Sequence, residues 1–176
     1  AAAAKNSSIS ASSIDIDKEV AGTNINTSVS SITIEPIKIS KLYNTNGNDF
    51  IELYNPNNFS VNLADSNYRL EKTRSAVNPS IMIRIGNEAD GQYPGGTTIA
   101  ARGYYLIVRT GASNYFISRA DAIASRNDFR LNSNAQTVYL GTGAISSYDD
   151  EDIVDVIGIG PQANYYLGSS PAPILE

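Results

Sequence analysis

The sequence predicts an all-β protein, and its composition and pattern both support this. The apolar residues are mainly Ile, Val, Leu and Tyr, a β-branched and aromatic set that favours strands. They occur in short runs, and the Asn, Ser, Gly and Thr between the runs suit turns. A chain of 176 residues, 41% of them hydrophobic, is long enough for one domain with its own core. We expect about seven to nine strands between Ile32 and Ile159, and no helix longer than about three turns.

The first expected element is an antiparallel hairpin over residues 38–55. The isoleucines of residues 32–39 alternate with polar residues, as in a strand that Pro36 interrupts. Asn46-Gly47 then signals a tight turn, because both residues tolerate positive φ. Further strands are expected from β-branched, aliphatic and aromatic runs at 49–55, 59–63, 68–72, 81–85, 104–109, 136–140 and 152–159.

Three segments are expected to differ from the strands. Residues 118–125 have an Ala-rich, helix-like composition that begins with Ser, which predicts one or two helical turns. Residues 91–96 lack the Lys and Ser/Thr of a phosphate-binding loop, so we expect a long turn. The Pro and Gly residues after residue 160 predict an irregular C-terminal tail.

Residues 104–109 are apolar on both faces, which predicts a central strand buried on both sides. Leu106 is therefore expected in the core, where its replacement by Ala should cost roughly 2–5 kcal/mol. The expected core residues are Ile39, Ile51, Leu53, Leu63, Leu70, Ile83, Leu106, Val108, Val138, Leu140, Val154 and Val156.

Charge and missing residue types argue against several functions. The net charge is -5 and no Lys/Arg cluster is present, so we do not expect nucleic acid as a partner. Without Cys and His, the chain has no thiolate nucleophile, no Ser-His-Asp relay and no Cys or His metal ligand. No apolar run approaches the roughly 20 residues of a membrane-spanning helix. We expect no catalytic residue and, apart from calcium, no cofactor.

Calcium is considered because Asp149, Asp150, Glu151 and Asp152 form the densest charge in the sequence, with Asp155 nearby. Ca²⁺ takes about six to eight oxygen ligands, which carboxylates can supply. The spacing does not match an EF-hand loop. Paired carboxylates could also hydrolyse glycosides, although the sequence indicates no sugar-binding cleft. A solvated acidic loop is the simplest interpretation.

Three asparagines, Asn6, Asn26 and Asn58, match the N-glycosylation pattern. Such matches also arise by chance in a chain rich in Asn and Ser, so the pattern leaves modification open.

Strand alternation places Glu52 on the face opposite Ile51 and Leu53. There it could contact a ligand or pair with a basic residue on a neighbouring strand. The adjacent rings of Tyr104 and Tyr105 should point to opposite faces, one into the core and one outward. An exposed tyrosine suits contact with protein or carbohydrate.

Residues 1–31 are expected to form a polar N-terminal arm or linker, and residues 32–176 the domain. The arm has no aromatic residue and one Gly. Ala1 to Ala4 could remain from a cleaved signal peptide or from cloning. Residues 7–17 and 23–34 alternate small polar residues with Ile, Ala or Val, so they could add as strands to a sheet edge. Pairing within the chain would give an extra strand, whereas head-to-tail pairing with the next copy would give a fibre.

Several motifs together resemble the lamin tail domain family. They are FIELYN at 50–55, VNL at 61–63, TIAARGYYLIV at 98–108, LN at 131–132, VYL at 138–140 and IVDVI at 153–157. The resemblance covers roughly residues 36–160 and implies an immunoglobulin-like antiparallel β-sandwich without catalytic residues. It also implies a secreted or cell-surface location of the bacterial or archaeal type. The chain has no heptad pattern, so it is not itself an intermediate filament.

The leading functional prediction is therefore a non-catalytic extracellular structural or protein-interaction module. Its partner is expected to be a protein, including copies of itself joined by strand addition through the arm. Two alternatives remain open: an accessory binding domain of a larger secreted hydrolase or nuclease, and a calcium-dependent adhesin.

Overall fold

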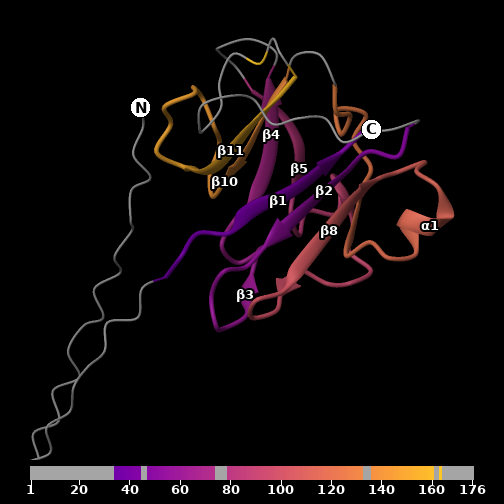
Figure 1. Ribbon diagram of the computed structural model, residues 1–176, viewed down its shortest axis with the longest axis horizontal. Coiled ribbons are helices and arrows are strands. Elements are labelled where there is room, and N and C mark those ends of the chain that lie inside the picture. The colour runs from indigo at the N-terminus through magenta and orange to yellow at the C-terminus, as the bar shows by residue number, and fades with distance from the viewer. Residues whose placement is uncertain (1–33, 45–46, 74–78, 133–135, 161–162, 164–176) are drawn as a thin grey trace, which may run out of the picture.

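Strands dominate the computed structural model, which describes residues 34–44, 47–73, 79–132, 136–160 and 163 (Figure 1). The arm at 1–31 lies outside these residues, as do Asn6 and Asn26. Two larger sheets pack face to face, so the predicted all-β sandwich is confirmed. The described residues contain eleven strands, more than expected, because three short strands were not predicted: β6, which lies in the expected turn at 91–96, β7 and β9.

The sheets have simple strand orders. The five-stranded sheet runs β1 (Lys38–Tyr43), β2 (Phe50–Tyr54), β8 (Tyr104–Arg109), β9 (Ala122–Ala124) and β6 (Gly91–Gln92). The four-stranded sheet runs β11 (Ile153–Ile159), β10 (Gln136–Gly141), β4 (Arg69–Thr73) and β5 (Ser80–Arg84). A small third sheet pairs β3 (Val61–Asn62) with β7 (Thr98–Ile99), and α1 (Asn114–Ile117) follows β8.

The predicted first hairpin is confirmed. β1 and β2 pair antiparallel, and Gly47 between them has φ 82°, where a side chain would be strained. The register shifts between Ile39 and Lys41, so Ser40 forms a β-bulge in β1. The bulge lets both Ile39 and Leu42 pack with the core on either side of it.

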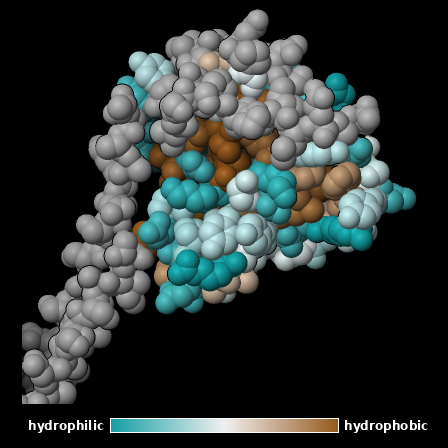
Figure 2. All heavy atoms as spheres, viewed as in Figure 1, coloured by the Kyte–Doolittle hydropathy of each residue, from teal (hydrophilic) through white to brown (hydrophobic). Residues whose placement is uncertain are grey.

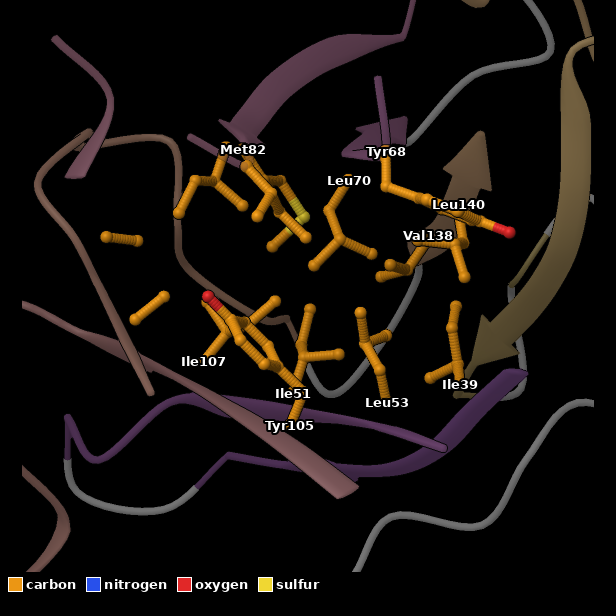
Figure 3. Close-up of a cluster of buried hydrophobic side chains, with 14 of the residues drawn as sticks. Ile39, Ile51, Leu53, Tyr68, Leu70, Met82, Tyr105, Ile107, Val138 and Leu140 are labelled. Atoms are coloured by element: carbon orange, nitrogen blue, oxygen red, sulfur yellow. The ribbon is translucent and has the colours of Figure 1, made fainter. Parts of the chain in front are cut away.

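The core lies between the two larger sheets (Figure 3). Ile51 and Leu53 of β2 and Tyr105 and Ile107 of β8 point toward Leu70 of β4. These side chains are all fully buried, as alternation requires for an inward-facing row. The predicted core residues that the structure places in this cluster are Ile39, Ile51, Leu53, Leu63, Leu70, Ile83, Val138 and Leu140.

The predicted inward face of β8 is wrong. Tyr105 and Ile107 face the main core, whereas Leu106 is only half-buried and Val108 is buried in a second cluster on the outer face. Because the strand is apolar on both faces, its pattern could not say which face points inward. Val154 also differs from the prediction, since it is half-buried, and Val156 is buried in a third cluster outside the four-stranded sheet.

The predicted helix at 118–125 is also wrong. Residues 122–124 form β9, which lies parallel to β8, so the sheet is not purely antiparallel. Asp121 starts this pairing, since its backbone N–H donates to the Leu106 carbonyl at 2.9 Å and its Oδ2 accepts from the Leu106 N–H at 2.7 Å. Ala122 and Ala124 are fully buried, so tertiary packing overrides their helix propensity.

The observed helix lies earlier in the chain. α1 has four residues, and the described parts of the chain contain no helix with the length and apolar character needed to cross a membrane.

Replacing Ile107 with Ala should lower the free energy of unfolding by roughly 2–5 kcal/mol, because it truncates a fully buried side chain. The matched control is Leu106→Ala on the opposite, half-buried side of the same strand, which should have a smaller effect. Urea unfolding followed by circular dichroism measures both. A loss for Leu106→Ala as large as that for Ile107→Ala would contradict this assignment of faces.

Candidate functional site

Another strand can add to a β-sandwich only at the edge strands of its sheets. Whether the backbone groups of each edge strand are already occupied therefore decides where the domain can bind an added strand. In the described residues the sheet edges are β1 and β6 of one sheet and β5 and β11 of the other. β6 has only two residues and offers little to pair with.

Side chains close the edge of β5. The Arg84 N–H donates to Asp90 Oδ2 at 3.1 Å, and the Arg84 carbonyl accepts from the Tyr93 hydroxyl at 2.7 Å. The Ile81 carbonyl accepts from Arg126 Nε at 3.3 Å. Backbone groups that a new strand would use are therefore already occupied.

Asp90 holds this closed edge together. Its carboxylate is fully buried and forms ion pairs with Arg84 at 2.6 Å and Arg126 at 3.1 Å. Burial by itself would raise the pKa of Asp90, but hydrogen bonds from the two guanidinium groups and the Arg84 N–H hold it below its usual value. The ionised group keeps both arginines in place along the edge.

The edges of β1 and β11 meet at a region that we call the seam, formed by Ile39, Leu42, Val154, Asp155 and Ile157. Among the described strands, β1 has a ladder partner only in β2, and β11 only in β10. Leu42, Val154 and Ile157 pack against the main core but stay half-buried. Figure 2 shows hydrophobic residues gathered at the surface where β1 and β11 adjoin. The seam thus combines edge backbone with partly exposed core residues.

Asp155 bridges the two sheets across the seam. Its Oδ2 accepts from the Ile39 N–H at 2.7 Å, and its Oδ1 accepts from the Val156 N–H at 2.9 Å. Burial raises the pKa of Asp155, and the two backbone hydrogen bonds and the charge of Lys38 oppose this only in part.

The predicted calcium ligands are not gathered into a site. Ser146 holds Asp150 through its backbone N–H at 2.8 Å and its hydroxyl at 2.7 Å, and Ser147 donates to Asp149 at 2.7 Å. In the described ranges no three acidic side chains, including Asp149, Asp150, Glu151 and Asp152, are grouped so as to hold a metal ion. The geometry therefore gives the calcium hypothesis no support.

Two further sequence candidates, Asn58 and Glu52, lie at the surface of the described residues. Asn58 is exposed at a bend between β2 and β3, so its side chain is open to modification. Glu52 lies on the outer face of β2, as predicted, and its Oε1 accepts from the Ser40 hydroxyl at 2.7 Å.

The outer face of the five-stranded sheet also holds a tyrosine pair that the sequence did not predict. The register places Tyr54 opposite Tyr104, and their ring centroids are 5.0 Å apart. Side-chain alternation predicted that one of Tyr104 and Tyr105 points outward. It could not predict the contact with Tyr54, because Tyr54 and Tyr104 are 50 residues apart in the sequence. Only the β2–β8 pairing brings the two rings together.

No protein-family model matches the chain, and no curated protein sequence does either. The lamin tail resemblance therefore remains a prediction carried by the motifs, and function has to be argued from the surfaces described above.

Replacing Asp155 with Asn should change how stability depends on pH. Because the pKa is raised, the folded protein binds a proton more readily than the unfolded chain, so this group lowers stability as pH rises through the interval from the unfolded to the folded pKa. Asn keeps an acceptor for the Ile39 N–H but does not titrate. The stability of Asp155→Asn relative to wild type should therefore increase between about pH 4 and about pH 7.

Urea unfolding at both pH values measures this difference. Asp149→Asn, a substitution of an exposed carboxylate, is the control and should show a smaller change. The interpretation fails if the Asp155 variant and wild type keep a constant stability difference across the interval.

Proposed function

We propose that this domain is a non-catalytic interaction module of an extracellular or cell-surface protein, and that it binds copies of itself by strand addition at the seam. The single observation that carries the proposal is the contrast between edges: β5 is closed by Asp90, Tyr93 and Arg126, whereas β1 and β11 leave core residues half-exposed. The lamin tail resemblance of the sequence agrees with such a role.

The seam suits an added strand in two ways. A strand in this position gains backbone hydrogen bonds from an edge and inserts alternate apolar side chains into the sheet surface. Leu42, Val154 and Ile157 offer the apolar contacts, because each already packs on the core. Burying such half-exposed aliphatic groups supplies about 25 cal/mol per Å² of apolar area.

The donor in this proposal is residues 23–34 of a neighbouring copy. Their alternation of small polar residues with Ile and Val matches the period of a strand. Donor and acceptor are different surfaces of the same chain, so the contact is head-to-tail and can extend into a fibre.

A non-catalytic role fits the chemistry of the chain. It contains no His and no Cys, which removes the commonest general base and the thiol nucleophile. The two carboxylates at the edges act structurally, Asp90 in ion pairs and Asp155 in backbone hydrogen bonds.

Deleting residues 1–31 should leave a folded monomer, while the full chain should form larger particles as its concentration rises. Val154→Lys in the full chain should also weaken assembly, because it places a charge among the half-buried residues of the seam. Size-exclusion chromatography with light scattering measures particle mass, and circular dichroism checks the fold.

The matched control is Gln92→Lys, which adds the same charge to an exposed position on the β6 edge and should leave assembly unchanged. A full chain that stays monomeric at high concentration, with its first 31 residues protected from proteolysis, would overturn assembly in favour of pairing within the chain.

A further inference from the structure

The outer face of the five-stranded sheet is divided into a covered half and an open half. The covered half is a second cluster in which Phe50 and Val108 pack beneath Phe116 of α1, with Tyr43 alongside. Figure 1 shows α1 beyond the C-terminal end of β8. Tyr104, at the other end of β8, is 61% exposed.

We name the open half the tyrosine face and define it by Tyr54, Tyr104, Glu52, Ser40 and Lys41. The pairing registers place Lys41 opposite Glu52 on neighbouring strands and Tyr54 opposite Tyr104. The tyrosine rings are tilted by 37°, at a centroid distance of 5.0 Å. The Ser40 hydroxyl donates to Glu52 Oε1 at 2.7 Å and to the Glu52 carbonyl at 3.1 Å. The aromatic pair thus adjoins fixed hydrogen-bonding groups on a rigid sheet.

A strained residue stands beside this face. Arg102 has φ 54°, a left-handed conformation that favours Gly or Asn, in the turn that leads into Tyr104. The backbone of the turn is held by the Arg102 N–H, which donates to the Asn57 carbonyl at 3.0 Å. The Gly103 N–H donates to the Ala100 carbonyl at 3.0 Å, so the positive φ of Arg102 belongs to the geometry of this β-turn and leaves the arginine exposed next to Tyr104.

From this arrangement we infer that the tyrosine face binds a neutral polysaccharide. The C–H groups on one side of a pyranose ring pack on an aromatic ring, and the hydroxyl groups around its rim need both donors and acceptors. Tyr54 and Tyr104 supply the rings, Lys41 and Arg102 supply donors, and Glu52 supplies an acceptor. Tyrosine supplies this contact area at a low conformational-entropy cost, since its side chain has two rotatable bonds.

A polysaccharide fits the face better than a protein does. The buried centres of protein interfaces are depleted of Lys, Glu and Ser, yet these residue types make up the rest of the tyrosine face. Small ligands bind in concave pockets, whereas an open sheet face suits an extended polymer. Affinity should therefore grow with the length of the oligosaccharide.

The test uses the full chain with soluble xylan, mixed-linkage β-glucan and galactomannan in affinity electrophoresis, and with cellulose and chitin in sedimentation. Wild type should bind at least one of these. Tyr104→Ala should weaken that binding at least about tenfold, which corresponds to about 1.4 kcal/mol. Tyr104→Phe should keep most of it, because the ring remains.

Tyr115→Ala is the matched control, since Tyr115 is 62% exposed but lies on α1 in the covered half, and it should bind as wild type does. Thermal melting checks that each variant folds. Absence of binding to every polysaccharide overturns the inference, as does equal binding by Tyr104→Ala. The inference is also overturned if Tyr104→Ala weakens binding to a protein but leaves binding to every polysaccharide unchanged. If the chain does not self-assemble, the inference of polysaccharide binding still holds, because the tyrosine face and the seam consist of different residues.

Discussion

Backbone pairing between β2 and β8 places Ile51 opposite Ile107 and Leu53 opposite Tyr105. Because successive side chains on a strand point to opposite faces, this one register decides the role of every residue on both strands. The inward rows form the centre of the main core, and the outward rows contain Phe50 and Val108 at one end and Tyr54 and Tyr104 at the other. A slip of one residue would turn the core row to solvent and break up the tyrosine pair.

The edges of the sandwich show two uses of a carboxylate, which is fully buried in Asp90 and half-buried in Asp155. Asp90 is held ionised by two guanidinium groups and closes the β5 edge. Asp155 faces the seam and has no guanidinium partner among the described residues, and burial raises its pKa while it accepts a hydrogen bond from the Ile39 N–H. The β5 edge is therefore closed by ion pairs, whereas the seam is bridged by the hydrogen bond of Asp155, which lies between half-buried aliphatic side chains. This difference in physical protection is why the seam, rather than β5, is the proposed place for strand addition.

The two proposed surfaces are compatible within one module. The seam uses the edges of β1 and β11, whereas the tyrosine face uses the outer side of β1, β2 and β8. Head-to-tail assembly through the seam would repeat the tyrosine face along a fibre. Repeated weak sites on one particle raise the overall affinity for a polymer by increasing the effective concentration of each site. An open, shallow site of modest affinity is then sufficient for attachment.

The sequence by itself determined the all-β class, the first hairpin and most of the main core, because β-branched runs with period two and turn residues such as Gly47 act locally. It did not determine which side of β8 faces inward, since both sides are apolar, nor that Ala122 and Ala124 form a buried strand in place of a helix. The outward position of Glu52 follows from the local alternation of side chains along its strand. The Asp155 bridge to Ile39 spans 116 residues, and the tyrosine pair joins strands 50 residues apart. Only tertiary structure decided these contacts, because strand register and sheet packing bring together residues whose separation leaves no local signal.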